Sequence, residues 1–463
     1  MGRALLRAFV VVLLAAGIGF GLLATLRVSP EPSVTLTPGA SAIGRKTAVE
    51  VAVQGGGRGL AGLKLELIQG DEAQVLAERA YSPRRPWQFW GPRTTEDALR
   101  VDVGSETVKG LRSGEATLRA SALRAGTWLR QPGPAVNERT LPVRLTPPSL
   151  HLLSIQHYVA QGGAEVVVYR TGETAVQDGV RAGDRWFPGF ALPGGGERDR
   201  FALFAVPHDL DDPARIRLVA SDDAGNEAAV AFVDQFFKKP FKTDTLTIDD
   251  RFMNKVVPEI LAQTPELKDR GGLLENYLAI NGDLRKTNGE TLKQLASRSA
   301  PRFLWAEAFL PMPGGQVMAA FADRRTYVYQ GREVDRQDHL GFDLATTRQA
   351  EVPAGNRGVV VLARYFGIFG NAVVIDHGYG LMSLYGHLSS TGVEEGQEVE
   401  RGAPIGRTGD TGLAGGDHLH FTMLVHGVAA NPAEWWDAHW IRDRLSRKLG
   451  AALPFGTPAP TGT

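Results

Sequence analysis

The chain of 463 residues contains no cysteine. This absence excludes disulfide bonds, thiol catalysis, zinc held by cysteine and the lipidated cysteine of a lipoprotein. A metal site in this chain must therefore be built from histidine and carboxylate side chains.

The sequence also lacks a net charge, since 51 lysine and arginine residues balance 51 aspartate and glutamate residues. A zero net charge offers no overall attraction to nucleic acid, so we expect no nucleic acid partner. Hydrophobic residues make up 43% and charged residues 22% of the chain, which excludes a disordered or wholly membrane-embedded protein. At ~150 residues per domain, the length predicts about three domains.

A long hydrophobic run occupies residues 8–26, and Arg3 and Arg7 precede it. A helix of this length spans roughly 28 Å, close to the ~30 Å hydrocarbon core of a bilayer. We expect residues 1–29 to be a membrane anchor or signal segment, and we favour the uncleaved anchor because no clean cleavage site precedes Ser29. A buried soluble helix is a third alternative, but it would need partners on all faces. The anchor predicts a single-pass protein of the cytoplasmic membrane, with the rest of the chain in the periplasm or outside the cell.

Two segments after this run consist of short strand-like stretches separated by glycine, proline and polar turns. Residues 48–53 and 164–169 are examples of such stretches. They predict a mostly β protein, with a β-sandwich-like domain at residues 30–148 and a second, immunoglobulin-like β domain at residues 149–240. The turn at residues 221–226 resembles the last hairpin of bacterial immunoglobulin-like domains.

The hydrophobic period changes to that of a helix in residues 241–300, which predicts a short helical connector. Helix starts are expected at Asp249–Asp250 and at Thr287–Glu290. Strand-like runs return at residues 358–363, 371–376 and 381–385, and a Gly-Tyr-Gly turn at residues 378–380 joins the last two. These runs predict a β-rich domain at residues 301–445, followed by a disordered tail at residues 446–463.

Six of the ten histidines lie between His339 and His426. His339 and Asp343 are four residues apart, and Gly341 between them is expected to let the backbone turn so that both side chains reach one ion. His418 and His420 lie two apart in a strand-like run, so both rings are expected on one face. Two histidines and a carboxylate leave a fourth position on Zn²⁺ for water. A single pair of this kind is more often an ordinary hydrogen-bonded pair, and a lone histidine such as His387 is more often structural, but their joint occurrence favours a metal site.

Residues 301–440 also contain an ordered series of short motifs. They are QDHLGFD at 337–343, GNAVVIDHG at 370–378, LYGHLS at 384–389, GQEV at 396–399, RG at 401–402, IG at 405–406, TGDTG at 408–412, DHLHF at 417–421 and NP at 431–432. This series resembles the lysostaphin-type, or LytM-like, zinc metallopeptidases of bacterial cell walls. Two positions depart from the commonest pattern of that family: Asp417 stands where a proline usually precedes the His-x-His motif, and Thr422 stands where a glutamate often follows it.

The resemblance implies one zinc ion held by His339, Asp343 and His420. It implies that His387 and His418 are the catalytic pair, which orient or deprotonate the attacking water and stabilise the oxyanion. His377 and His426 are expected to be structural or to lie at the rim. The implied function is a zinc metalloendopeptidase that hydrolyses peptide bonds in the stem peptides or cross-links of peptidoglycan.

Two other functions stay open from the sequence. One is a non-catalytic, LytM-like protein that binds the wall or activates another hydrolase, although such proteins have lost ligands that this chain keeps. The other is an adhesion or scaffold role for the β segments, which we expect instead to be a stalk. The basic and aromatic run at residues 84–90 predicts either a contact surface or a packed loop. We also expect the connector or the first sandwich to cover part of the zinc cleft and restrain activity.

Overall fold

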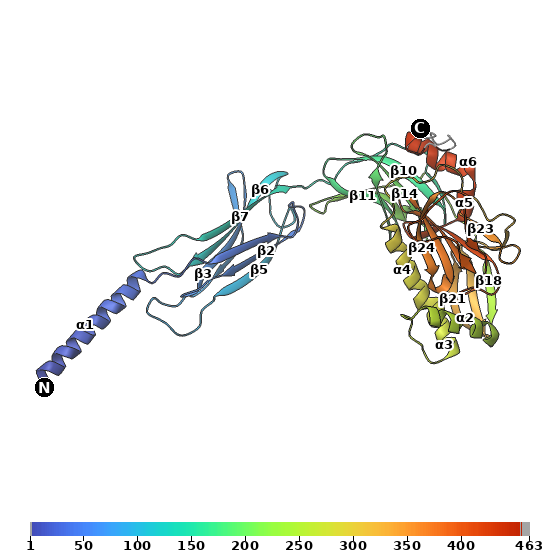
Figure 1. Ribbon diagram of the computed structural model, residues 1–463. Helices are drawn as coiled ribbons and strands as arrows, with labels where there is room; N and C mark the ends of the chain where they lie inside the picture. Colours follow the sequence, from blue (N-terminus) through green and yellow to red (C-terminus); the bar gives the residue numbers. More distant parts are fainter. Residues whose placement is uncertain (1, 454, 456–463) are drawn as a thin grey trace. The chain divides into compact units, whose positions relative to one another are not determined.

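The computed structural model describes residues 2–453 and 455 and is mostly β, as predicted (Figure 1). It has an apolar helix near its amino terminus, short helices in the middle and a β-rich carboxy-terminal region. The chain divides into two compact units. The first runs to Pro148 and takes in residues 174–176 and 221–228, and the second contains the other residues from Ser149 onward.

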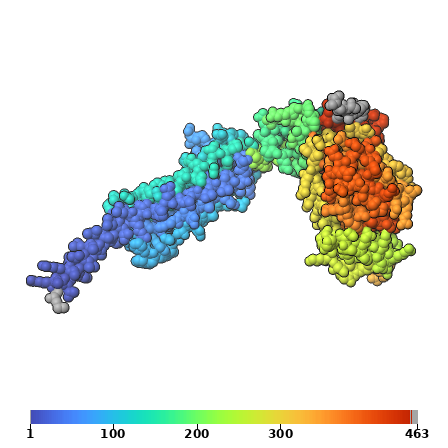
Figure 2. All heavy atoms as spheres, in the orientation of Figure 1, coloured from blue at the N-terminus to red at the C-terminus, as the bar shows by residue number. Residues whose placement is uncertain are grey.

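Helix α1 (Gly2–Leu26) contains the predicted hydrophobic run and has no buried residue. Most of its side chains are exposed, and only residues toward its carboxy-terminal end are partly covered (Figure 2). Among the described residues it is the one helix that is long and apolar enough to cross a membrane. A signal sequence has the same length and composition, so the helix fits both predictions.

Two sheets of the first unit enclose one hydrophobic core. Every second residue of β2 is buried, because alternate side chains of a strand point to opposite faces. Val51 of β2 and Leu65 of β3 belong to the same buried cluster, so the sheets pack face to face. One sheet has the order β1 (Ser33–Pro38), β2 (Thr47–Gln54), β5 (Glu96–Val103), and the other has the order β4 (Glu72–Ala80), β3 (Leu60–Gln69), β6 (Gly114–Arg124), β7 (Ala135–Val143).

The second predicted β segment packs directly on the carboxy-terminal region. Val166, Phe201 and Phe204 share one buried cluster with Trp305 and Trp435. The two regions therefore have a continuous core, and the immunoglobulin-like detail of this segment stays a prediction. Its elements are β8 (Leu150–Leu152), β9 (Tyr158–Ala160), β10 (Ala164–Thr171), β11 (Ala175–Ala182), β12 (Arg185–Pro188), β13 (Phe190–Ala191), β14 (Asp199–Ala205), η1 (Pro213–Arg215), β15 (Ile216–Asp222), β16 (Glu227–Val230) and β17 (Gln235–Phe237).

An eight-stranded sheet forms the centre of the carboxy-terminal region. Its order is β19 (Gln316–Ala319), β22 (Phe342–Ala345), β30 (Leu419–Val425), β26 (Leu381–Leu388), β25 (Asn371–Gly378), β24 (Gly358–Tyr365), β28 (Glu398–Val399), with β31 (Val428–Ala430) paired to β30. The three predicted strand runs lie in β24, β25 and β26. The predicted turn joins the last two, and Gly378, Tyr379 and Gly380 all have positive φ angles.

The described residues of the carboxy-terminal region also form two three-stranded sheets. One consists of β18 (Thr243–Ile248), β20 (Asp323–Tyr329) and β21 (Arg332–His339), and the other of β23 (Glu351–Pro353), β29 (Pro404–Arg407) and β27 (Ser390–Thr391). Strand β18 comes from the predicted connector and pairs in parallel with β20. The connector is therefore not purely helical.

Helices α2 (Asp250–Gln263), α3 (Leu273–Ala279) and α4 (Arg285–Ala296) make up the rest of the connector, with a π turn, η2 (Ile280–Leu284), between the last two. Helix α2 begins as predicted, because the Asp249 carboxylate accepts a hydrogen bond from the Phe252 amide. The predicted start at Thr287 is wrong. Residues 287–290 lie inside α4, where the Thr287 hydroxyl donates to the Asp283 carbonyl one turn earlier.

The first residues of the predicted disordered tail are ordered. After α5 (Pro432–Trp436) and α6 (Ala438–Ile441), the chain continues through η4 (Arg442–Ser446), α7 (Arg447–Leu449) and η5 (Gly450–Ala452). Leu449 and Leu453 are buried in the main core, and the Lys448 ammonium lies 2.7 Å from the buried Glu165 carboxylate. This burial orders the segment despite its composition. Residues 454 and 456–463 of the predicted tail lie outside the described residues.

Candidate metal centre

Neighbouring strands bring three of the predicted site residues together. His339 is the last residue of β21, Asp343 lies in β22 and His420 lies in β30. Asp343 and His420 are directly opposite each other in the antiparallel pairing of β22 and β30. Side chains in opposite positions of two strands point to the same face about 5 Å apart, so the register itself places the carboxylate beside the ring.

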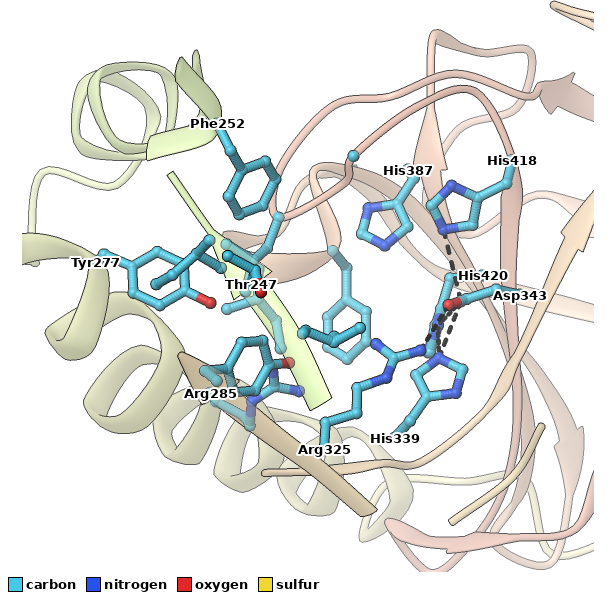
Figure 3. A pocket seen from close by; sticks show the side chains of 17 residues that line it. Thr247, Phe252, Tyr277, Arg285, Arg325, His339, Asp343, His387, His418 and His420 are labelled. Carbon is cyan, nitrogen blue, oxygen red and sulfur yellow. Dashed lines mark hydrogen bonds and ion pairs between the residues drawn. The ribbon is translucent and has the colours of Figure 1, made fainter. Parts of the chain in front are cut away.

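The polar atoms of these three side chains converge on one point (Figure 3). Asp343 Oδ1 lies 2.9 Å from His339 Nε2 and 2.9 Å from His420 Nδ1, and these two nitrogens are 3.1 Å apart. One ligand atom from each residue lies within 4.8 Å of the others. A single ion between them could therefore contact all three.

In each ring, the hydrogen bond of the nitrogen that points away from the group determines whether the nitrogen that points into the group carries a proton or a lone pair. His339 Nδ1 lies 3.0 Å from the Ala320 carbonyl oxygen, which can only accept, so Nδ1 carries the proton and Nε2 presents a lone pair. The Thr422 hydroxyl donates to the Leu340 carbonyl oxygen at 2.8 Å and accepts from His420 Nε2 at 3.0 Å. His420 Nδ1 therefore presents its lone pair as well.

His387 and His418 lie beside this group, with their ring centroids 4.8 Å apart. His387 lies near the carboxyl end of β26, and its neighbour Gly386 is opposite His420 in the sheet. The Nδ1 atoms of His387 and His418 donate to the carbonyl oxygens of Thr411 and Gly416, at 2.9 and 2.7 Å. Both rings line the same cavity as the other three residues, and His418 Nε2 lies 3.5 Å from Asp343 Oδ1.

Burial and charge set the protonation of the group. Burial raises the pKa of Asp343, but the polar contacts with the imidazole rings of His339, His418 and His420 outweigh burial and hold the pKa well below its usual range. Burial lowers the pKa of His420 to about 4, and burial together with the neighbouring rings lowers the pKa of His387 well below its usual value. For His418, the Asp343 carboxylate outweighs burial and raises the pKa.

The donor set suits a divalent cation. An ionised carboxylate and two imidazole lone pairs that face one another at about 3 Å repel unless a proton or a cation lies between them. Two histidines and one carboxylate, each held by an outer hydrogen bond or ion pair, are the ligands that zinc takes in hydrolytic sites. The residues present therefore fit the metal that the resemblance implies.

Arg325 also belongs to this site, although the sequence did not indicate it. Its Nη2 atom lies 3.0 Å from Asp343 Oδ2, so the guanidinium holds one carboxylate oxygen and leaves Oδ1 facing the histidines. Arg325 lies in β20 opposite Gln337, two residues from His339. Only the register of the β20–β21 hairpin connects it to the site, and no local motif indicates that register.

Gly341 has a different role from the predicted one. A Cβ atom at this position would lie 2.7 Å from Cε1 and from Nε2 of His420, and 2.6 Å from the Thr422 hydroxyl. Glycine is therefore needed because the His420 ring approaches the backbone closely, and any larger side chain would displace that ring.

A cavity of about 280 Å³ opens beside the group, and the connector forms one side of it. Phe252 of α2, Tyr277 of α3 and Arg285 of α4 line it together with the four histidines (Figure 3). The Tyr277 hydroxyl is buried and has no hydrogen-bond partner among the described residues. The connector thus lines the cavity, while the expectation that it covers part of the cleft and restrains activity stays a prediction.

Helix α2 also fastens the loop that orients His387. The Glu259 carboxylate accepts from the Gly412 amide at 2.9 Å, and the Lys255 ammonium lies 2.7 Å from the Asp410 carboxylate. Thr411, between these two positions, supplies the carbonyl oxygen that accepts from His387 Nδ1. A shift of α2 would therefore move a partner of the predicted catalytic ring.

The remaining two histidines of the region do not line this cavity. His377 is fully buried between the Arg357 carbonyl oxygen and the Ser383 hydroxyl, at 2.7 and 2.8 Å. His426 stacks on Phe190 with ring centroids 5.8 Å apart. Both positions agree with the structural roles expected from the sequence.

Comparison with known proteins connects this geometry to a family. Peptidase family M23 matches residues 337–432. Peptidoglycan DD-endopeptidase ShyA of Vibrio cholerae is 32% identical over 169 residues, which cover 36% of this chain and 36% of that protein. DD-carboxypeptidase/endopeptidase Mpg of Neisseria meningitidis is 39% identical over 94 residues, which cover 20% of this chain and 22% of that protein. The murein hydrolase activator EnvC of Escherichia coli is 38% identical over 95 residues, which cover 20% and 23%.

The chain thus spans little more than a third of the length of these relatives at most. Among solved structures, a putative peptidase M23 from Pseudomonas aeruginosa is 21% identical with a TM-score of 0.36. The match covers 59% of this chain and 93% of the Pseudomonas chain. A zinc containing peptidase from Vibrio cholerae is 15% identical with a TM-score of 0.25, and the match covers 70% of this chain and 86% of the Vibrio chain. The assignment of residues 337–432 to peptidase family M23 rests on the sequence match.

Proposed function

Residues 337–432 form a domain of peptidase family M23, and on this basis we propose that the protein is a zinc-dependent endopeptidase that hydrolyses peptide bonds of peptidoglycan. The observation that carries the proposal is the convergence of His339, Asp343 and His420 with two further imidazoles in one cavity. Relatives named as peptidoglycan DD-endopeptidases support the substrate class.

His339, Asp343 and His420 would hold the metal. A zinc ion, when bound, polarises a carbonyl group and lowers the pKa of a water molecule. His387 and His418 supply the remaining chemistry, because the Nδ1 atom of each is held by a carbonyl oxygen and both rings line the cavity, with His418 Nε2 3.5 Å from Asp343 Oδ1. A neutral ring there accepts a proton from the attacking water, and a protonated ring donates a hydrogen bond to the developing oxyanion.

The far end of the cavity is suited to a carboxylate of the peptide substrate. Arg325 and Arg285 both line the cavity, and Arg325 is paired with Asp343. Arg285 donates to the Asn281 carbonyl and side-chain oxygens at 3.0 and 2.6 Å, and forms no ion pair among the residues that the structure describes. Its positive charge, next to the unpartnered Tyr277 hydroxyl, attracts an anionic group.

Helix α1 would anchor the protein in the cytoplasmic membrane, with the chain that follows it in the periplasm or outside the cell. The β segments that follow it would act as a stalk between the membrane and the peptidase domain. The first of these segments has a hydrophobic core of its own, and strand β2 in it alternates buried and exposed positions, which is typical of a spacer domain.

The match to a murein hydrolase activator supports a second candidate, in which the domain binds the wall and activates another enzyme. The two candidates differ in what they require of His420. An activator would keep working without this ligand, whereas hydrolysis would stop.

The test uses the full chain in detergent micelles, with isolated peptidoglycan as the substrate. We expect one zinc per chain by elemental analysis and new muropeptides by mass spectrometry. His420→Ala should lose both the zinc and the products. His439→Ala is the matched control, because His439 lies in α6 with an exposed side chain, and it should behave like the parent. A parent protein that binds zinc and leaves every type of peptidoglycan unchanged would refute hydrolysis.

A further inference from the structure

Two loops of the first unit expose large apolar side chains beside the end of α1. They are residues 81–95, between β4 and β5, and residues 125–134, between β6 and β7. The exposed fractions are 39% for Trp87, 56% for Phe89, 71% for Trp90, 76% for Trp128 and 59% for Leu129. We call these five residues the aromatic collar. A group of large apolar side chains this exposed marks an interaction surface rather than a packed loop.

Hydrogen bonds hold both loops against the carboxy-terminal end of α1. The Thr127 hydroxyl donates to the Thr25 carbonyl oxygen at 2.7 Å. Arg27 Nη1 donates to the Pro86 and Gln88 carbonyl oxygens at 2.8 and 3.2 Å. The collar therefore lies at the junction between the apolar helix α1 and the β-sandwich that follows it.

Ring contacts add to this attachment. The rings of Phe20 and Trp87 lie 5.2 Å apart, and the Arg27 guanidinium lies 3.9 Å from the centroid of the Phe89 ring. Phe20 belongs to the hydrophobic part of α1. The apolar surface of the helix thus continues into the apolar surface of the collar.

A buried arginine fixes the three segments to one another. Arg58, which is 5% exposed, donates through Nη1 to the carbonyl oxygens of Arg27 and Gly126 at 3.2 and 2.7 Å. Its Nε atom donates to the Arg84 carbonyl oxygen at 2.6 Å. One guanidinium therefore connects the end of α1 with both loops, so the collar has a defined position at the end of the helix.

The two loops are also uniformly positive. They contain Arg84, Arg85, Arg93 and Arg130 and no aspartate or glutamate. Arg84 is used inside its loop, where it donates to the Phe89 carbonyl oxygen at 3.0 Å. The other three add positive charge beside the collar, although Arg93 also donates to the Gly57 carbonyl oxygen.

We propose that the aromatic collar and these arginines form a docking surface for the membrane into which α1 is inserted. The aromatic side chains enter the boundary between headgroups and acyl chains, where tryptophan is enriched, and the arginines bind lipid phosphates. We assign a bilayer as the partner of this surface because the surface is continuous with a helix that is long enough to span one. This inference rests on the proposed anchoring by α1 and is independent of the peptidase chemistry.

The surface would change how the first unit stands on the membrane. A helix followed by an unattached chain allows the domain to tumble, whereas a collar attached to the helix end and inserted in the membrane restricts it. The peptidase domain would then start from a defined base rather than from a free tether.

Tryptophan quenching by lipids with bromine near the headgroup tests the proposal. The full chain is reconstituted in vesicles of phosphatidylcholine with a minor fraction of phosphatidylglycerol. We expect part of the tryptophan emission to be quenched, and expect Trp87→Ser, Trp90→Ser and Trp128→Ser together to abolish the quenched part. Trp186→Phe, a change in β12 of the second unit, is the control and should leave the quenching in place.

A second set of variants tests the charges. Arg85→Gln, Arg93→Gln and Arg130→Gln together should reduce the quenching severalfold in vesicles that contain phosphatidylglycerol and less in vesicles of phosphatidylcholine alone. Arg45→Gln with Lys46→Gln is the control, because these residues precede β2, whose eight residues place them about 26 Å from the loops at its other end. This control should keep the quenching of the parent.

The outcomes separate the proposals. All variants should float with the vesicles, because α1 is intact, and all should hydrolyse peptidoglycan if the proposed function holds. A parent that floats with its collar tryptophans unquenched would refute the docking surface, and would assign the collar to a wall polymer or a protein partner. A parent that fails to float would refute the anchoring and, with it, the proposed docking surface.

Discussion

Thr422 provides the sharpest test of the metal centre, because its hydroxyl group accepts from His420 Nε2 and donates to the Leu340 carbonyl oxygen. Thr422→Val keeps the shape of the side chain and removes both hydrogen bonds. A buried N–H group left without an acceptor costs about 1 to 3 kcal/mol. Loss of the outer partner of a metal-binding histidine typically lowers metal affinity ~10- to 100-fold, which corresponds to about 1.4 to 2.8 kcal/mol. The two estimates agree, so we expect zinc affinity to fall by one to two orders of magnitude.

The assay is a zinc titration in competition with a chromophoric chelator, together with the rate of muropeptide release at saturating zinc. Thr422→Ser keeps the hydroxyl and should restore most of the affinity. Thr47→Val is a matched control in the first unit, because the buried Thr47 hydroxyl also accepts from an amide, that of Gly44 at 2.9 Å. It should lower the unfolding temperature without changing zinc affinity. Parental zinc affinity in Thr422→Val would refute the assigned role of the hydroxyl.

Three further predictions concern the reaction, the substrate and the dependence on pH. His387→Ala should bind zinc like the parent and lose hydrolysis by at least ~100-fold, as measured by muropeptide release, since this ring is placed for proton transfer and not for ligation. Arg285→Met should raise KM severalfold for peptides that carry a free carboxylate and leave KM unchanged for their amides, and equal effects on both would contradict the anionic subsite. Burial raises the pKa of Glu434 from 4.5 to about 8, so the protonated carboxyl stabilises the folded second unit below pH 4.5 and this contribution is lost as the pH rises to about 8. Glu434→Gln should therefore flatten the fall in unfolding temperature between about pH 5 and pH 8, and an unchanged slope would assign that fall to other groups.

The strands and the ligand motifs could be predicted because their signals are local. Alternation of apolar residues indicates a strand, and the Gly-Tyr-Gly turn at residues 378–380 fixes how two strands join. The His-x-His spacing places His418 and His420 near one centre, and both rings indeed face it. Residues whose relation depends only on neighbours within a few positions are visible in a sequence.

The parts that escaped prediction depend on distant neighbours. Arg325 reaches Asp343 through the register of a hairpin, and Gly341 is required by a ring that belongs to another strand. Cap-type residues at Thr287 indicated a helix start, but the same residue types occur inside α4 because packing overrides their weak preferences. Composition predicted disorder after residue 446, whereas the buried Leu449 and Leu453 keep that stretch in place.

The side of the cavity formed by Phe252, Tyr277 and Arg285 lies outside the segment that matches the peptidase family. The four histidines and Asp343, by contrast, all lie inside it. Mutation can therefore alter the shape and charge of this side without touching a single ligand. The reacting groups and the part of the cavity that would select among ligands therefore belong to separate stretches of the chain, and each can change without the other.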